Sequence, residues 1–199
     1  RAETTRWMLA INDIPFENIL IDTPEKLKAL RATGKLPFDQ MPLLEIDGRN
    51  LSQSSAMIRY LARRGGFYGD TDTDALWCDL IAGAVSDFAE TGLKAMFQPT
   101  DEIAISEQQA TFNKFAPCFE MRLKENGTGF FVGARLSFAD VILVESLSSY
   151  LEWIPNILES SPLLKSLNET VLNQPGIKAY LASGLRYPKP DNTTVIHIA

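Results

Sequence analysis

The stretch between residues 40 and 63 carries the side chains best suited to hold a ligand. Gln53 and Ser54 directly precede a segment whose apolar residues repeat at helical spacing. The first turn of a helix has unpaired N–H groups and the positive end of the helix dipole, so it can bind a carboxylate. Pro42 opens a short apolar run, where a cis peptide could aim the backbone at a ligand. From the pattern alone, an ordinary strand, turn and capped helix is the simpler explanation.

The rest of the composition limits the chemistry that this chain can perform. His197 is the single histidine among 199 residues, so a His-dependent triad or a His/Cys metal site lacks its residues, and we expect no metal. A net charge of -6 disfavours nucleic-acid binding, and no apolar run reaches the roughly 20 residues that span a membrane. Cys78 and Cys118 lie in helical patterns without metal-ligand spacing, which predicts reduced, buried thiols in a cytoplasmic protein.

Helix and turn signals predict the elements that position the ligand-binding stretch. Residues 1–10 show helical spacing, and residues 19–21 form an apolar run typical of a short strand. Thr23 and Pro24 begin a second helix, which Gly34 should end. Asp47 and Gly48 between two apolar runs predict a β-hairpin, because these residue types tolerate the positive φ of hairpin turns. A third helix then begins at residue 54 or 55.

The glycine-rich segment at residues 65–69 divides the chain into two parts of different pattern. We therefore expect an α/β domain over residues 1–64 and an all-helical domain over residues 70–199. Ser137 and Asp140 form a capping box, to which we assign a purely structural role. The helices expected in the second domain span residues 70–97, 103–124 with a kink at Pro117, 141–150, 162–172 and 176–181.

Several segments resemble a known family. The segments MPLLEIDG and QSSAMIRYLA, with RAETTRW, GKLPFDQMP, SDFAE and LSFADVILVE, are similar to cytosolic glutathione transferases of the alpha and sigma classes over most of the chain. The resemblance implies an α/β N-terminal thioredoxin-like domain and an all-α C-terminal helical domain. It also implies a dimeric cytoplasmic enzyme that conjugates the glutathione thiolate to apolar electrophiles in detoxification.

The resemblance assigns roles to individual residues. Arg1 would stabilise the glutathione thiolate, Arg31 would meet the glycine carboxylate, and Asp87 would reach the γ-glutamyl ammonium of a ligand in the partner subunit. Phe38 would be the aromatic key that docks into the other subunit of a homodimer. The other residues expected to bind glutathione are Gln40, Met41, Pro42, Gln53, Ser54 and Lys114. The electrophile pocket would lie between the domains, near the C-terminal tail and Leu93, Lys94 and Phe97.

The chain departs from the family pattern at the residue that activates the thiol. In alpha and sigma relatives this residue is a tyrosine on a first strand, upstream of the position of Arg1, and no tyrosine of this chain takes its place. We expect a short upstream segment in the natural protein, because residues 19–21 would otherwise lack the neighbouring strand. Two alternatives remain open: a non-catalytic, crystallin-like member of the fold, or a glutathione-dependent isomerase resembling prostaglandin synthases.

Overall fold

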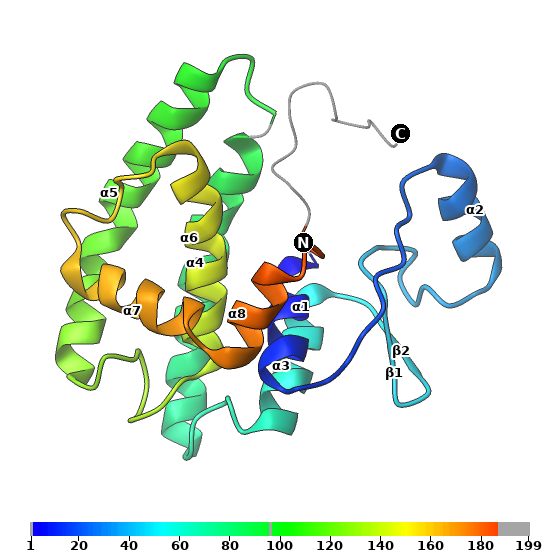
Figure 1. The fold of residues 1–199 in the computed structure, drawn as a ribbon, viewed down its shortest axis with the longest axis horizontal. Helices are drawn as coiled ribbons and strands as arrows, with labels where there is room; N and C mark the ends of the chain where they lie inside the picture. Colours follow the sequence, from blue (N-terminus) through cyan, green and yellow to red (C-terminus); the bar gives the residue numbers. More distant parts are fainter. Residues whose placement is uncertain (1, 96, 187–199) are drawn as a thin grey trace.

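The computed structural model describes residues 2–95 and 97–186, which form two domains (Figure 1). A small α/β domain comes first and an all-helical domain follows, which confirms the predicted fold class. The first domain consists of α1 (Glu3–Ile11), α2 (Pro24–Ala32), β1 (Leu44–Ile46), β2 (Arg49–Leu51) and α3 (Ser54–Gly65). The second consists of α4 (Asp72–Ala95), α5 (Asp101–Asn126), α6 (Phe138–Trp153), α7 (Pro162–Leu172) and α8 (Pro175–Ala182).

The predicted β-hairpin is confirmed. β1 and β2 pair in antiparallel fashion, and the two turn residues, Asp47 and Gly48, have φ values of 51° and 72°. Positive φ at both positions is the geometry of a type I′ turn, which matches the twist of the strands it joins. The Tyr60 hydroxyl of α3 donates to the Asp47 carboxylate at 2.8 Å. The turn is therefore fixed against α3, the helix that follows it in the chain.

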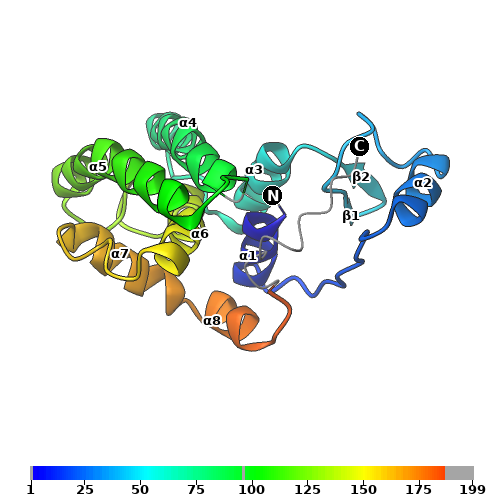
Figure 2. The same cartoon turned by 90° about the horizontal axis from the view of Figure 1, so that it is seen from above.

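The strand expected at residues 19–21 is wrong. These residues have no strand geometry, and the side chains of Ile19 and Leu20 are 74% and 47% exposed. Within the described part of the chain, the sheet consists of β1 and β2 alone. A strand persists only when its N–H and C=O groups pair with a neighbour. The apolar segment is therefore an extended link between α1 and α2, and α2 lies with the hairpin away from the helical domain (Figures 1 and 2).

The helical domain is built around α6. α4 and α7 both pack against α6, while α5 packs against α4 and α7 (Figures 1 and 2). α5 continues past Pro117, and its buried residues include Phe112, Phe119 and Leu123. These side chains form the core together with Phe88 of α4. The four helices thus share one continuous apolar core.

Helix α1 joins the two domains into a single core. Trp7 and Met8 are completely buried, and α1 packs against α3 of its own domain and against α6 and α8 of the other. The Glu3 carboxylate accepts hydrogen bonds from the Trp7 indole at 3.1 Å and from the Tyr180 hydroxyl at 3.0 Å. Because Tyr180 belongs to α8, these bonds link the two ends of the described chain.

The predicted capping box at the start of α6 is confirmed. Asp140 is completely buried and accepts hydrogen bonds from the Ser137 N–H and hydroxyl, both at 2.7 Å. It also accepts from the backbone N–H of Phe131 at 2.8 Å. Burial raises the pKa of the Asp140 carboxyl to about 6, although these bonds act in the opposite direction. The box therefore ties the loop before α6 to the first turn of this helix.

The two cysteines differ in solvent exposure, and the predicted burial of one of them is wrong. Cys78 of α4 is buried and unpaired, as predicted, whereas Cys118 of α5 is unpaired and exposed. The buried residues of α5 near this point are Ala116 and Phe119, which leaves Cys118 on the outer side of the helix.

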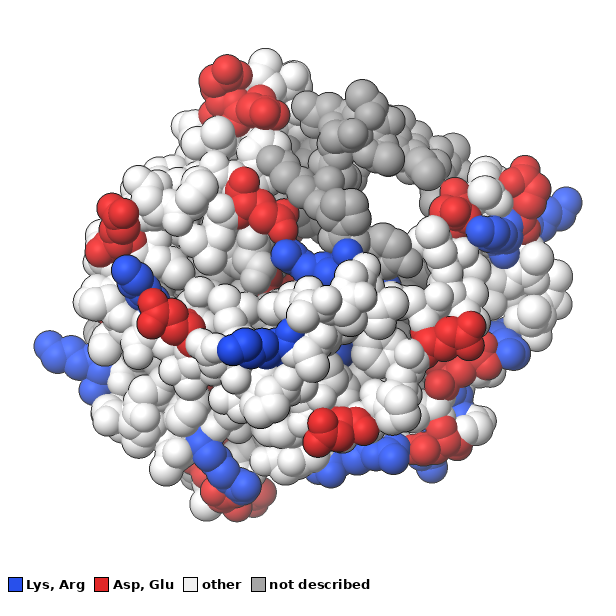
Figure 3. Space-filling view, viewed as in Figure 1, with Lys and Arg blue, Asp and Glu red and all other residues white. Residues whose placement is uncertain are grey.

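Acidic and basic side chains are interspersed on the face shown in Figure 3. Several oppositely charged neighbours form ion pairs, such as Lys26 with Asp22 at 2.6 Å and Lys35 with Glu45 at 2.7 Å. These side chains are about half exposed, and solvent screens such pairs so that they contribute little to stability. The fold therefore depends on its apolar core more than on its surface charge.

Candidate functional site

The residues expected to cradle a ligand come together at the start of α3. The Met41–Pro42 peptide is cis, as the sequence suggested. Gln53, the residue before α3, has a φ of 68°, which is uncommon for a residue other than glycine. Its side-chain amide donates to the Gln40 side-chain oxygen at 2.7 Å. This bond joins the two loops on either side of the hairpin, next to the unpaired N–H groups of the first turn of α3.

The conformation of Gln53 indicates a functional constraint. A left-handed conformation costs a residue with a side chain on the order of 1 kcal/mol, and such residues cluster at ligand-binding sites. The positive φ of Gln53 places its side-chain amide next to the N-terminus of α3. Such a combination of neutral donors and a helix N-terminus suits a carboxylate.

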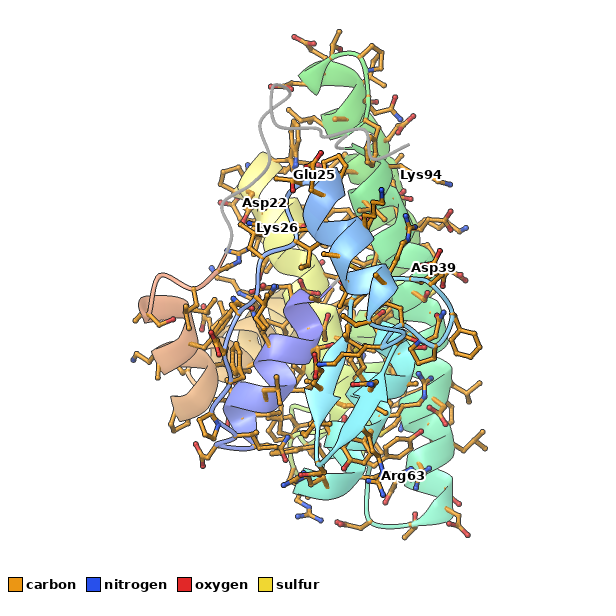
Figure 4. The ribbon with its side chains drawn as sticks, turned by 90° about the vertical axis from the view of Figure 1, so that its right-hand side faces the viewer. Asp22, Glu25, Lys26, Asp39, Arg63 and Lys94 are labelled. Atoms are coloured by element: carbon orange, nitrogen blue, oxygen red, sulfur yellow. The ribbon has the colours of Figure 1, made fainter. Side chains whose placement is uncertain are left out.

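The end of α2 and the loop that follows it carry Arg31, Phe38 and Met41, which were expected to bind glutathione or the partner subunit. The Arg31 guanidinium pairs with Asp39 at 2.7 Å, and both side chains are about half exposed. Figure 4 shows Asp39 in this loop, beyond the end of α2. Phe38 is 67% exposed and Met41 is 38% exposed. Arg31 therefore has a carboxylate partner already, with which a ligand carboxylate would have to compete.

A cavity of about 670 Å³ lies between the two domains. The first domain contributes Thr4 and Glu3 of α1 and Ser54 of α3, and the second contributes one face each of α4 and α6. Ser54 thus belongs both to the cradle and to the cavity wall. A ligand held at the start of α3 would extend into the cavity, which is large enough for a second small molecule.

The three residues expected to form the electrophile pocket lie near one end of α4. Leu93 lines the cavity, whereas Lys94 and Phe97 are not among the lining residues that the structure describes. Figure 4 shows Lys94 on the outer side of α4, and its ammonium pairs with Glu90 at 2.8 Å. Phe97 is 61% exposed. The pocket role of Lys94 and Phe97 therefore stays a prediction from the family resemblance.

Glu145 of α6 is the most unusual charged residue of the cavity. It is half-buried and accepts a hydrogen bond from the Thr4 hydroxyl at 2.7 Å. Burial raises the pKa of the Glu145 carboxyl, and Glu3 adds to this shift, while the Thr4 bond and the positive charges of the amino terminus and of Arg186 oppose it. Glu145 was not among the site residues expected from the sequence, although a glutamate inside the apolar run LSFADVILVE is an unusual feature.

The remaining residues of the expected site do not meet the cradle within this single chain. Asp87 on α4 and Lys114 on α5 are exposed, and the Lys114 ammonium lies 5.0 Å from the centre of the Phe115 ring. Asp87 was expected to act on the partner subunit, so its position here does not test that role. Arg1 and His197 lie outside the described residues.

Two kinds of site have no counterpart in the described part of the chain. Residues 2–95 and 97–186 contain no group of three His, Cys, Asp or Glu side chains placed to hold a metal ion. In the same ranges, no helix combines the length and the apolar character that crossing a membrane requires.

Comparisons with known proteins agree with this architecture. The model of the glutathione S-transferase N-terminal domain matches residues 1–63, and that of the glutathione S-transferase C-terminal domain matches residues 86–184. Glutathione S-transferase alpha M14 of Sus scrofa is 37% identical over 194 residues, which cover 96% of this chain and 87% of that protein.

Solved structures show the same similarity. A monomeric glutathione S-transferase from the hookworm Necator americanus has a TM-score of 0.83 at 28% identity, covering 94% of this chain and 93% of its own. Prostaglandin synthase D of Nilaparvata lugens has a TM-score of 0.76 at 27% identity, covering 95% of this chain and 94% of its own. With both domain models matched and a relative above 30% identity over nearly the whole chain, this protein belongs to the glutathione S-transferase family.

Proposed function

We propose that this protein is a glutathione transferase that joins the sulfur of glutathione to electrophilic small molecules. The observation that carries the proposal is the hydrogen bond between Gln40 and Gln53, beside the cis Met41–Pro42 peptide and the N-terminus of α3. It brings together residues that the family resemblance assigns to glutathione, and the cavity beside them can hold the electrophile.

The proposed binding mode follows from the chemistry of glutathione. Gln53, Ser54 and the first turn of α3 hold the γ-glutamyl carboxylate, and the backbone of Met41 pairs with the cysteine part. Pro42 shapes this loop, and Gln40 supports Gln53. Arg31 meets the glycine carboxylate.

In the reaction, the thiol releases its proton to solvent and the thiolate attacks the electrophilic carbon. A carbon–sulfur bond forms, and the leaving group departs with its electron pair. Arg1 would stabilise the thiolate through its charge, because a guanidinium beside a sulfur lowers the thiol pKa. The upstream tyrosine expected from the resemblance would add a hydrogen bond to the same sulfur.

We further propose a cytoplasmic homodimer that acts in detoxification. Phe38 supports the dimer, because a large aromatic side chain that is 67% exposed is a natural anchor for a partner surface. In such a dimer Asp87 would reach the partner's γ-glutamyl ammonium, and Lys114 would add positive charge near the ligand. The hookworm relative with a similar fold is monomeric, so the oligomeric state of this chain is itself a measurement to make.

Calorimetric titration with glutathione tests the cradle. We expect binding by the wild-type chain and roughly tenfold weaker binding by Gln53→Ala, the loss typical of one charge-assisted hydrogen bond. Gln109→Ala is the matched control, because Gln109 forms a similar side-chain bond, with Asn113 at 3.0 Å, on α5. Failure of the wild-type chain to bind glutathione would overturn the proposal.

A conjugation assay with 1-chloro-2,4-dinitrobenzene then separates the candidate functions. Conjugation at a rate above that of glutathione alone supports the transferase. Glutathione binding without conjugation favours the non-catalytic, crystallin-like alternative. Turnover of prostaglandin H2 that requires glutathione would favour the isomerase, the alternative suggested by the similarity to prostaglandin synthase D of Nilaparvata lugens.

A further inference from the structure

Two long helices of the second domain, α4 and α6, pack against each other and together form one side of the cavity. The residues that α4 contributes include the apolar Ala82, Val85, Ala89 and Leu93, which repeat every three or four residues, and the polar Ser86 and Glu90. The wall from α6 carries a polar stripe at the same helical spacing, formed by Glu145, Ser146, Ser149 and Glu152. The cavity therefore offers an apolar strip on α4 next to carboxylates and hydroxyls that come from both helices.

Most charged side chains of the cavity already have partners of opposite charge. Glu3 pairs with Arg6 at 3.1 Å, and Glu152 pairs with Arg186 at 2.6 Å. Glu90 of α4 pairs with Lys94, and Arg59 of α3 pairs with Asp79 at 2.8 Å. These pairs leave little net charge to attract a ligand.

Glu145 differs from these residues. Its carboxylate accepts the Thr4 hydroxyl, and no Lys or Arg side chain among the described residues lies within ion-pair distance of it. A half-buried carboxylate without a cation is costly to ionise, which agrees with its raised pKa. A ligand cation would supply the missing partner, and the surrounding burial would strengthen the interaction relative to water.

We propose that the cavity takes amphipathic cations, with an apolar body against α4 and a protonated amine beside Glu145. As a statement about substrates, this inference rests on the proposed function: the electrophiles would then be amine-bearing compounds with an apolar body. The hydroxyls of Ser146 and Ser149 can accept the remaining ammonium hydrogens, since an ammonium has three donors. Glu145 is thus a specificity residue, and it takes no part in the chemical step.

The pH dependence of binding follows from the groups that face Glu145. These are Glu3, Arg6 and Thr4 of α1, Arg59 of α3, Glu90 of α4, Glu152 on its own helix and Arg186 after α8. Apart from Thr4, each of these is in an ion pair, whereas Glu145 is in none among the described residues and feels the positive charges of the amino terminus and of Arg186 from farther away. An ammonium binds the ionised form, so its affinity rises with pH through the pKa of Glu145.

Two small probes of equal length test the inference. We would titrate the full chain with 4-phenylbutylammonium and with 4-phenylbutanol, which differ only in the charged group. The wild-type chain should bind the ammonium roughly tenfold more tightly, the ratio expected for one hydrogen bond to a charged group. Glu145→Gln should abolish this preference and leave the affinity for the alcohol unchanged. The substitution keeps the size of the side chain and an oxygen for Thr4, so the fold should be retained.

Controls separate this inference from the proposed function. Glu169→Gln removes an equal charge from the exposed surface of α7 and should keep the wild-type preference. Gln53→Ala should weaken glutathione binding and leave the probe preference intact, so either proposal can fail without the other. If Glu145→Gln does not fold, a wild-type series between about pH 5 and pH 8 replaces it, with the preference expected to grow as pH rises. Equal affinity for the two probes, or a preference that Glu145→Gln retains, would overturn the inference.

Discussion

Removal of the Asp140 carboxylate is expected to destabilise the whole protein. This side chain satisfies three buried donors: the N–H groups of Phe131 and Ser137 and the hydroxyl of Ser137. Each donor left without a partner costs about 1 kcal/mol or more, so Asp140→Ala should lower the free energy of unfolding by about 3 kcal/mol at neutral pH. Urea unfolding followed by tryptophan fluorescence measures this loss, because Trp7 is completely buried.

Two comparisons make the test of Asp140 specific. Ser137→Ala removes one donor and the cap of α6, so it should cost only about 1 kcal/mol. Asp101→Ala removes an exposed acidic residue from the first turn of α5 and should change stability by less than about 0.5 kcal/mol. If Asp140→Ala costs no more than Ser137→Ala, the three hydrogen bonds do not act as argued.

The pH dependence of the unfolding free energy gives a second test of Asp140, in the wild-type chain and in Asp140→Ala. Burial raises the pKa of Asp140 in the folded state to about 6, above its ordinary value of 3.8. The folded chain therefore holds a proton that the unfolded chain releases, and this contribution to stability is complete below about pH 4 and lost as pH rises through 6. The difference in unfolding free energy between wild type and Asp140→Ala should thus be larger at about pH 4 than at about pH 7. An unchanged or smaller difference at the lower pH would contradict this sign.

Two further predictions concern packing and thiol reactivity. In Gly176→Ala the new Cβ would lie 2.1 Å from the Ala10 carbonyl oxygen, so α8 must shift away from α1. Urea unfolding should then show a loss of about 2 kcal/mol in the free energy of unfolding. Gly83→Ala is the control and should be neutral or stabilising, because a Cβ at this position meets nothing within 4 Å. Equal effects would show that the α1–α8 contact adapts without cost. Exposed Cys118 should react rapidly with a disulfide reagent at about pH 8, whereas burial raises the pKa of Cys78 to about 11 and should delay its reaction until unfolding. Cys118→Ser should abolish the rapid phase, and a rapid phase that persists would place the reactive thiol at Cys78.

The features that the sequence predicted well depend on neighbouring residues. Asp47 and Gly48 specify their turn through the φ values that they tolerate. Thr23 and Pro24 begin α2 for two local reasons. The Thr23 hydroxyl accepts a hydrogen bond from the backbone N–H of Lys26, and Pro24 lacks an N–H at a position where the helix would leave that group unpaired. The capping box of α6 is equally local. Such signals act over three or four residues, so a linear pattern contains them completely.

The features that the sequence predicted poorly depend on distant partners. Residues 19–21 have the composition of a strand, but no neighbour within the described residues pairs with them. Glu145 lies in an apolar run, and only the packing of α1 against α6 shows that Thr4 binds it at the cavity wall. The exposure of Cys118 could have been predicted from helical spacing, because Cys118 falls between the buried positions of α5.

The position of α1 has a consequence for how the protein is made. Tyr180, which donates to Glu3 of this helix, is synthesised 177 residues after it. Until α6 and α8 exist, the apolar side chains of Trp7, Met8 and Leu9 have no complete site in which to be buried. The nascent chain therefore carries an exposed apolar helix until α8 has been synthesised, a state prone to aggregation that molecular chaperones protect. Docking of α1 also closes a loop that spans nearly the whole described chain, which places this contact among the slow steps of folding.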